Sequence, residues 1–148
     1  MSTLRIGIIG LGTVGAGTIN ILRQTGSELA RRSGVDFLVT AAAARDLDKP
    51  RECDLSGISL FADPLELVRS DQVDVVVELM GGDTVAKDVF NLAIELGKPV
   101  VTANKALIAV HGSELLGRAA KAEVPIKFEA AVAGGIPIIK ALREGLAA

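Results

Sequence analysis

The sequence predicts an α/β protein built on a doubly wound parallel sheet. Short apolar runs that suit buried strands alternate with segments of helical periodicity. The first run, residues 4–9, leads into Gly10-Leu11-Gly12-Thr13-Val14-Gly15, whose glycine spacing is typical of a tight strand-to-helix turn. Because strands joined by helices pair in parallel through right-handed crossovers, six such runs predict a single parallel sheet.

The first half of the chain contains three expected strands and two expected helices. A helix is expected over residues 16–32, where Ile19, Leu22, Leu29 and Ala30 form a loose apolar stripe and Gly34 is a suitable stop. Gly26 should weaken or bend this helix. Apolar strands follow over residues 37–44 and 58–62. Asp63 as N-cap and Pro64 at the first helical position then begin a helix that runs to about residue 70.

The second half repeats the alternation. A valine-rich strand over residues 73–79 ends at Met80-Gly81-Gly82. The next helix, 84–96, has Val85, Val89, Ala93 and Leu96 on one face and stops at Gly97. The remaining elements are a strand over 99–102, a helix over 113–122, a strand over 124–129, a small-residue loop and a helix over 137–146.

Composition excludes several classes of protein. Sixteen basic and 18 acidic residues leave a net charge of −2, so nothing predicts binding to nucleic acid or to an anionic membrane. No apolar run approaches the roughly 18–20 residues of a membrane span, and we reject a signal peptide because glycines interrupt the N-terminal run. A single cysteine, Cys53, is expected to be a surface thiol and fits a cytoplasmic protein.

The glycine turn carries the first functional prediction. Gly10 lets the chain reverse, Gly12 lets a pyrophosphate approach the backbone, and Gly15 lets the helix pack close to the strand. The helix that follows presents its N–H groups and the positive end of its dipole to phosphates. The sequence therefore predicts a Rossmann domain that binds a dinucleotide; the alternative is a glycine-rich turn without a ligand.

The end of the second strand bears on the choice of cofactor. NAD sites place an acidic residue there for the ribose 2′-hydroxyl, whereas NADP sites supply arginine for the 2′-phosphate. Here Ala44 and Arg45 end the strand, which favours NADP. Asp46 or Asp48 would favour NAD if either pointed into the site. A solvated charged loop is the structural alternative.

Three further residues could carry chemistry. Lys105 follows the fifth strand and could stabilise negative charge on an oxygen during hydride transfer, or it could be a surface lysine. Glu129 precedes a glycine-rich loop and could bind a cation or a substrate ammonium, or could anchor the loop through backbone N–H groups. His111 is expected to cap or pack a helix terminus before Gly112 rather than act as an acid or base.

The chain resembles the amino-terminal part of the homoserine dehydrogenases. The resemblance covers nearly the whole chain, and its two later stretches are more specific than the glycine turn. Its stretches are residues 10–15, residues 44–51, Val75-Val76-Val77-Glu78-Leu79-Met80-Gly81-Gly82 running on to Val101-Thr102-Ala103-Asn104-Lys105-Ala106-Leu107, and Glu129-Ala130-Ala131-Val132-Ala133-Gly134-Gly135-Ile136-Pro137-Ile138-Ile139.

This resemblance implies interconversion of L-aspartate 4-semialdehyde and L-homoserine with NADP or NAD, in threonine, methionine and isoleucine biosynthesis. It implies a catalytic role for Lys105 as one of two important lysines. The implied cofactor-binding residues are Gly10, Leu11, Gly12, Thr13, Val14, Gly15, Ala44, Arg45, Gly81, Gly82, Asn104 and Lys105. A monovalent cation such as Na⁺ would be bound by Glu129, Val132, Gly134 and Ile136.

The resemblance also implies a chain truncated before an α+β substrate domain. Residues 1–130 would form the dinucleotide-binding domain, and residues 131–148 would begin the connection to that second domain, which supplies the other lysine and most of a homodimer contact. The chain alone is then expected to turn over no substrate. Asp83-Thr84 departs from what members often show. Alternatives are another NAD(P)-dependent dehydrogenase and a non-catalytic nucleotide-sensing module.

Overall fold

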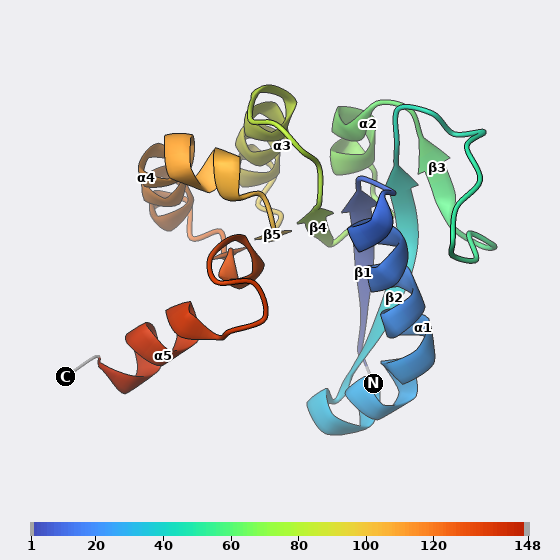
Figure 1. The fold of residues 1–148 in the computed structure, drawn as a ribbon, viewed down its shortest axis with the longest axis horizontal. Coiled ribbons are helices and arrows are strands. Elements are labelled where there is room, and N and C mark those ends of the chain that lie inside the picture. Colours follow the sequence, from blue (N-terminus) through green and yellow to red (C-terminus); the bar gives the residue numbers. More distant parts are fainter. Residues whose placement is uncertain (1, 147–148) are drawn as a thin grey trace.

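A computed structural model describes residues 2–146 and confirms the predicted α/β class (Figure 1). One six-stranded parallel sheet has the order β3-β2-β1-β4-β5-β6. The strands are β1 (Ser2–Ile9), β2 (Val35–Ala43), β3 (Ser59–Phe61), β4 (Val75–Glu78), β5 (Val100–Thr102) and β6 (Ile126–Lys127). The helices are α1 (Thr13–Ser33), α2 (Pro64–Arg69), α3 (Thr84–Glu95), α4 (Lys105–Lys121), the 3₁₀ helix η1 (Glu129–Ala131) and α5 (Ile138–Gly145).

The order of the strands places a topological switch point beside β1. The chain begins in the middle of the sheet, adds β2 and β3 on one side, and returns to add β4, β5 and β6 on the other. β1 and β4 pair directly, with Ile9 opposite Glu78 at their carboxyl ends. In open α/β sheets, ligands bind in the crevice outside the strand ends at such a point.

Two separate hydrophobic clusters cover the two faces of the sheet. Adjacent residues of a strand point to opposite faces; Ile8 packs with Ile19 of α1, whereas Ile9 belongs to the cluster under α2, α3 and α4. Phe90 of α3 and Leu115 of α4 are fully buried in that second cluster. In Figure 1, α1 lies against β1 and β2, and α3 and α4 lie together on the other half of the sheet.

Two helices begin earlier than the sequence predicted. α1 begins at Thr13, directly after the N-cap Gly12, and continues without a break through Gly26. α4 begins at Lys105, eight residues before the expected start at residue 113. The reason is Asn104, whose side chain accepts a hydrogen bond from Leu107 N as the N-cap of α4.

The buried face of α3 also differs from the prediction. Val85 and Leu96 are 49% and 47% exposed, although we expected both on the buried stripe. The residues that α3 buries are Ala86, Val89, Phe90, Ala93 and Ile94. The helix is therefore rotated toward Ala86 and Phe90, and Val85 is left at the carboxyl edge of the sheet.

A long loop instead of a helix joins β2 to β3. α1 holds this loop: Arg23 donates to Asp54 Oδ2 at 2.8 Å and to the Ser56 carbonyl at 2.7 Å, and Asn20 donates to the Glu52 carbonyl. Cys53 lies half-buried in the loop, packed against the α1 cluster, so the predicted surface thiol is only partly exposed. Burial raises the pKa of this thiol.

Several local predictions are confirmed. Asp63 caps α2 by accepting a hydrogen bond from Leu65 N at 2.8 Å, with Pro64 at the first helical position. Gly34 ends α1 in the left-handed conformation, at φ 75°. None of the helices within residues 2–146 combines the length and the apolar character needed to cross a membrane.

Two glycines give a matched test of this packing. At Gly7 in β1, an added Cβ would lie 2.7 Å from Leu67 Cδ2 and 2.9 Å from Val73 Cγ1. We predict that Gly7→Ala lowers the free energy of unfolding by about 1 to 3 kcal/mol, because the core must move.

Gly26 is the control, since nothing lies within 4 Å of its added Cβ. Gly26→Ala should raise the free energy of unfolding by about 0.5 to 1 kcal/mol through helix propensity. Urea denaturation of both variants measures the two changes. If Gly7→Ala had the same free energy of unfolding as the wild type, the close packing of α2 on β1 would be contradicted.

Candidate functional site

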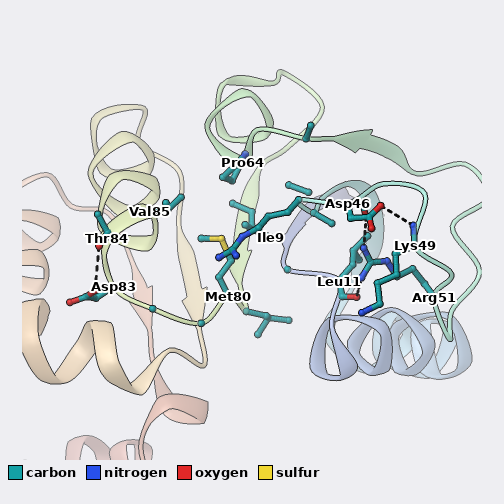
Figure 2. Close-up of a pocket in the computed structure, with 18 residues that line it drawn as sticks. Ile9, Leu11, Asp46, Lys49, Arg51, Pro64, Met80, Asp83, Thr84 and Val85 are labelled. Atoms are coloured by element: carbon teal, nitrogen blue, oxygen red, sulfur yellow. Dashed lines mark hydrogen bonds between the residues drawn. The ribbon is translucent and has the colours of Figure 1, made fainter.

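A cleft of about 650 Å³ opens at the carboxyl ends of β1 and β4. Four segments line it: the end of β1 with Gly10 and Leu11 of the glycine turn (residues 10–15), the end of β2 with the 44–51 loop, Ala62 with Pro64 at the start of α2, and the 79–83 loop with the start of α3. Figure 2 shows Ile9 and Met80 between two walls, with Leu11, Asp46, Lys49 and Arg51 on one side and Asp83, Thr84 and Val85 on the other. The cofactor-binding residues predicted from sequence that line the cleft are Gly10, Leu11, Ala44, Arg45, Gly81 and Gly82.

Two glycines of the turn are required by the backbone. Gly10 has φ +101°, and a Cβ there would lie 2.8 Å from the Leu79 carbonyl oxygen. A Cβ on Gly15 would lie 1.9 Å from the Gly10 carbonyl oxygen, so α1 packs against the turn only because residue 15 is glycine. Gly15 is buried and acts in packing, as the sequence predicted.

Gly12 plays a different part, because nothing lies within 4 Å of its added Cβ. It is the N-cap of α1 and offers no side-chain oxygen to the first N–H groups of the helix. Thr13 and Val14 are exposed, and the first turn of α1 contains no acidic residue. Open space, N–H donors and the positive end of the helix dipole therefore meet at one point, which suits an anion.

Of the two aspartates in the 44–51 loop, only Asp46 lines the cleft, and its carboxylate is hydrogen-bonded to the backbone of the loop. Asp46 Oδ1 accepts hydrogen bonds from Asp48 N at 3.0 Å and Lys49 N at 3.1 Å. Arg45 and Lys49 line the same wall of the cleft, whereas Asp48 does not. This wall therefore offers two cations, with Asp46 Oδ1 already engaged.

Arg51 joins this loop to the glycine turn. Its guanidinium donates to the Leu11 carbonyl at 2.6 Å and to the Asp46 carbonyl at 2.5 Å (Figure 2). The sequence analysis assigned no separate role to Arg51. The arginine fork instead fixes the spacing between the glycine turn and the 44–51 loop on this side of the cleft, because two of its nitrogens are bonded to backbone oxygens.

A buried carboxylate that the sequence analysis did not single out supports the opposite wall. Glu78, at the end of β4, is fully buried; Oε1 accepts from Met80 N at 2.7 Å and Oε2 accepts from the Thr102 hydroxyl at 2.7 Å. Burial raises the pKa of Glu78, and the hydrogen bonds from Thr102, Met80 and Asn104 oppose that rise. An acidic residue at the end of a valine-rich strand was the available sequence signal.

Asn104 and Lys105 lie outside the cleft lining. The Asn104 side chain is buried and donates to the Gly82 carbonyl at 2.6 Å. Lys105 is exposed as the first residue of α4. The structure thus links these two residues to the 79–83 loop through Gly82.

His111 lies inside α4, so the predicted place at a helix terminus is wrong. Its Nε2 is 3.7 Å from Asp83 Oδ2, and Asp83 lines the cleft. This contact connects α4 to the start of α3 and is a second link between α4 and the loop after β4.

The loop predicted to bind a cation is built differently from the cleft. Glu129 Oε1 accepts from Ile139 N at 2.8 Å and Oε2 accepts from Lys140 N at 3.1 Å, so the carboxylate anchors the start of α5. The Ile136 carbonyl accepts from Ile138 N at 2.8 Å. Among residues 2–146, no group of three or more His, Cys, Asp or Glu side chains is arranged to hold a metal ion.

A family model and the curated relatives that match this chain all point to the same family. Residues 10–129 match the family model described as the NAD-binding domain of homoserine dehydrogenase. The homoserine dehydrogenase of Pseudomonas aeruginosa is 51% identical over the whole chain, which corresponds to 34% of that protein. The chain thus spans about a third of the length of the curated relatives it matches.

Solved structures agree with this result. A homoserine dehydrogenase from Thiobacillus denitrificans superposes with a TM-score of 0.88 at 46% identity, over 98% of this chain and 33% of that one. A hyperthermophilic archaeal homoserine dehydrogenase in complex with NADPH superposes with a TM-score of 0.75 at 26% identity, over 96% of this chain and 48% of that one.

Burial of Glu78 generates a prediction about stability and pH. A raised pKa in the folded state means that folding favours the protonated carboxyl over the ionised one. The stabilising contribution of the proton is therefore complete below about pH 4.5 and is lost as the pH rises through the raised pKa. We predict that the free energy of unfolding of the wild type, relative to Glu78→Gln, falls over this range.

Urea denaturation at a series of pH values measures the difference. Glu66→Gln, on the exposed side of α2, controls for the loss of one negative charge. If the free energy of unfolding of the wild type, relative to Glu78→Gln, rose with pH, burial would not be the main influence on the pKa of Glu78.

Proposed function

This chain belongs to the homoserine dehydrogenase family as its NAD-binding domain, and on that premise we propose that it binds NADPH in the cleft between β1 and β4. The observation that carries the proposal is the glycine turn at the switch point, with Gly12 open to solvent at the start of α1. This arrangement suits a pyrophosphate that approaches the backbone without meeting a side chain.

The 44–51 loop supports NADP over NAD. A 2′-phosphate would meet Arg45, with Lys49 on the same wall. The ribose 2′-hydroxyl of NAD would need an acidic acceptor; Asp46 lines the same wall, but its Oδ1 is bonded to two backbone N–H groups of its own loop, which leaves Oδ2 for this role. The archaeal relative in complex with NADPH supports the same choice.

The remaining cofactor contacts follow from this placement. We assign the pyrophosphate to Gly10, Leu11, Gly12, Thr13 and Val14, with Gly15 as the packing residue that keeps α1 close. We place Ala44 beside Arg45 at the adenosine end, and Gly81 and Gly82 in the wall toward the nicotinamide, with Asn104 behind that wall and bonded to the Gly82 carbonyl.

The reaction proposed for the whole protein is the reduction of L-aspartate 4-semialdehyde to L-homoserine and its reverse. NADPH would supply the hydride that adds to the aldehyde carbon, which leaves negative charge on the carbonyl oxygen. The Lys105 ammonium, exposed at the start of α4 beside the Gly82 wall, is proposed to stabilise that charge and supply a proton. Lys105 is the catalytic residue that this chain would contribute.

The rest of the active site is proposed to lie in a further domain. Because the chain spans about a third of its relatives' length, we propose that residues 131–148 begin the connection to a substrate domain that also forms a homodimer. On this proposal, the chain alone binds cofactor and shows no homoserine oxidation.

The proposed cation site fits this arrangement poorly. A monovalent cation such as Na⁺ would need oxygens from Glu129, Val132, Gly134 and Ile136. The Glu129 carboxylate and the Ile136 carbonyl already accept hydrogen bonds from the chain at the start of α5. We derive no catalytic step from a cation.

Arg45→Ala tests the choice of cofactor. We predict that the wild type binds NADPH more tightly than NADH, and that the variant loses about 10- to 100-fold in NADPH affinity, the usual contribution of a hydrogen bond to a charged group. NADH affinity should change little. Titration followed by cofactor fluorescence measures both, and the lack of Trp and Tyr keeps the protein background low.

Arg31→Ala is the matched control, since Arg31 is an exposed arginine in the last turn of α1, at the end opposite the glycine turn. It should leave both affinities unchanged. Tighter binding of NADH by the wild type would overturn the assignment of NADP, and binding of neither cofactor would overturn the proposed site.

A further inference from the structure

Glu78 is a buried carboxylate that the proposed chemistry does not use. No part of the residue is exposed to solvent, and it lies at the carboxyl end of β4, next to the switch point. Burying a carboxylate is unfavourable unless hydrogen bonds replace the lost water. All of its donors are neutral groups: Met80 N, the Thr102 hydroxyl and, at 3.4 Å, the Asn104 amide.

These bonds tie together segments that are far apart in the sequence. Through Met80 N, the carboxylate fixes the first peptide of the 79–83 loop. Through the Thr102 hydroxyl it reaches the end of β5, and that hydroxyl in turn accepts from Asn104 N at 2.9 Å. The Glu78 side chain therefore adds a buried link between the ends of β4 and β5, which already pair at Glu78 and Thr102 in the sheet.

Asn104 extends the network in two directions. Its amide nitrogen donates to the Gly82 carbonyl at 2.6 Å, and its amide oxygen accepts from Leu107 N at 3.1 Å. The first bond holds the far end of the 79–83 loop, where Gly82 has φ +84°. The second bond begins α4, whose first residue is Lys105.

We propose that Glu78 is a positioning residue for the nicotinamide end of the cleft. It acts through Met80 N on the 79–83 loop, and through Thr102 and Asn104 on the start of α4 that carries Lys105. This inference rests on the proposed binding of NADPH in the cleft. An apolar residue in the same space would leave the Met80 N–H and the Thr102 hydroxyl without their acceptor.

Glu78 lies behind only one end of the cleft, so we expect the effect of its loss to be local. The adenosine end is built by the 44–51 loop and by Arg51, which bonds to Leu11 and Asp46 and not to Glu78. Disturbing the Glu78 network should therefore change the nicotinamide wall and leave the adenosine wall in place. General destabilisation of the fold would affect both walls together.

The test compares two probes of the same cleft. Calorimetric titration with NADPH reports on both ends, whereas adenosine 2′,5′-bisphosphate occupies only the proposed adenosine end. We expect Glu78→Leu to weaken NADPH binding about tenfold, as residues that orient a binding group do at other sites. Its affinity for adenosine 2′,5′-bisphosphate should stay within about twofold of the wild type.

Glu78→Gln is the conservative variant. Its amide oxygen can still accept from Met80 N, and its amide nitrogen can donate to the Thr102 oxygen, so NADPH affinity should return close to that of the wild type. Glu66→Leu, on the exposed side of α2, controls for the replacement of a carboxylate by leucine. It should leave both affinities unchanged.

Each other outcome has a definite meaning. If the wild type binds NADPH and Glu78→Leu binds it equally well, the positioning role is overturned and the proposed function stands. If a folded Glu78→Leu loses both probes equally, the role is also overturned. If the wild type binds neither probe, the proposed function itself fails. If Glu78→Leu does not fold, the same two probes are compared with Thr102→Val. This variant removes the hydroxyl between Glu78 and Asn104 and tests the same positioning role.

Discussion

The close approach of α1 to the end of β1 is the contact on which the rest of the site depends. A Cβ on Gly15 would lie 1.9 Å from the Gly10 carbonyl oxygen, so the helix can begin where it does only without side chains at this contact. That packing brings the open Gly12 and the N-terminus of α1 to the switch point between β1 and β4. The open backbone and the N–H groups that suit an anion at this point therefore follow from backbone geometry.

The other walls of the cleft depend on buried or bonded side chains. Arg51 ties the 44–51 loop to the glycine turn through two backbone carbonyls, while Glu78 and Asn104 hold the 79–83 loop and the start of α4. The glycine turn thus requires residues without side chains. The 44–51 and 79–83 loops instead require polar side chains that make hydrogen bonds within the protein. This division explains why the cleft combines open backbone with fixed loops.

The sequence predicted the parts of the fold that local rules control. Strand and helix alternation, the Gly10 and Gly15 turn and the Asp63 cap all depend on neighbouring residues, and the structure confirms them. Hydrogen bonds and packing, which periodicity does not report, decide the other features. These are the early start of α4, the rotation of α3 and the bonding of Asp46 to the backbone of its own loop. Glu78 went unnoticed because its side-chain partners, Thr102 and Asn104, lie 24 and 26 residues away in sequence.

The proposal that a nicotinamide dinucleotide lies across the β1–β4 crevice can be tested by NMR. The ¹⁵N-labelled chain would be titrated with NADPH and its amide shifts followed residue by residue. We expect the largest changes at the glycine turn, at Arg45 and at residues 81–84. Changes concentrated instead in the groove between Phe128 and α5, or no changes at saturating NADPH, would contradict it.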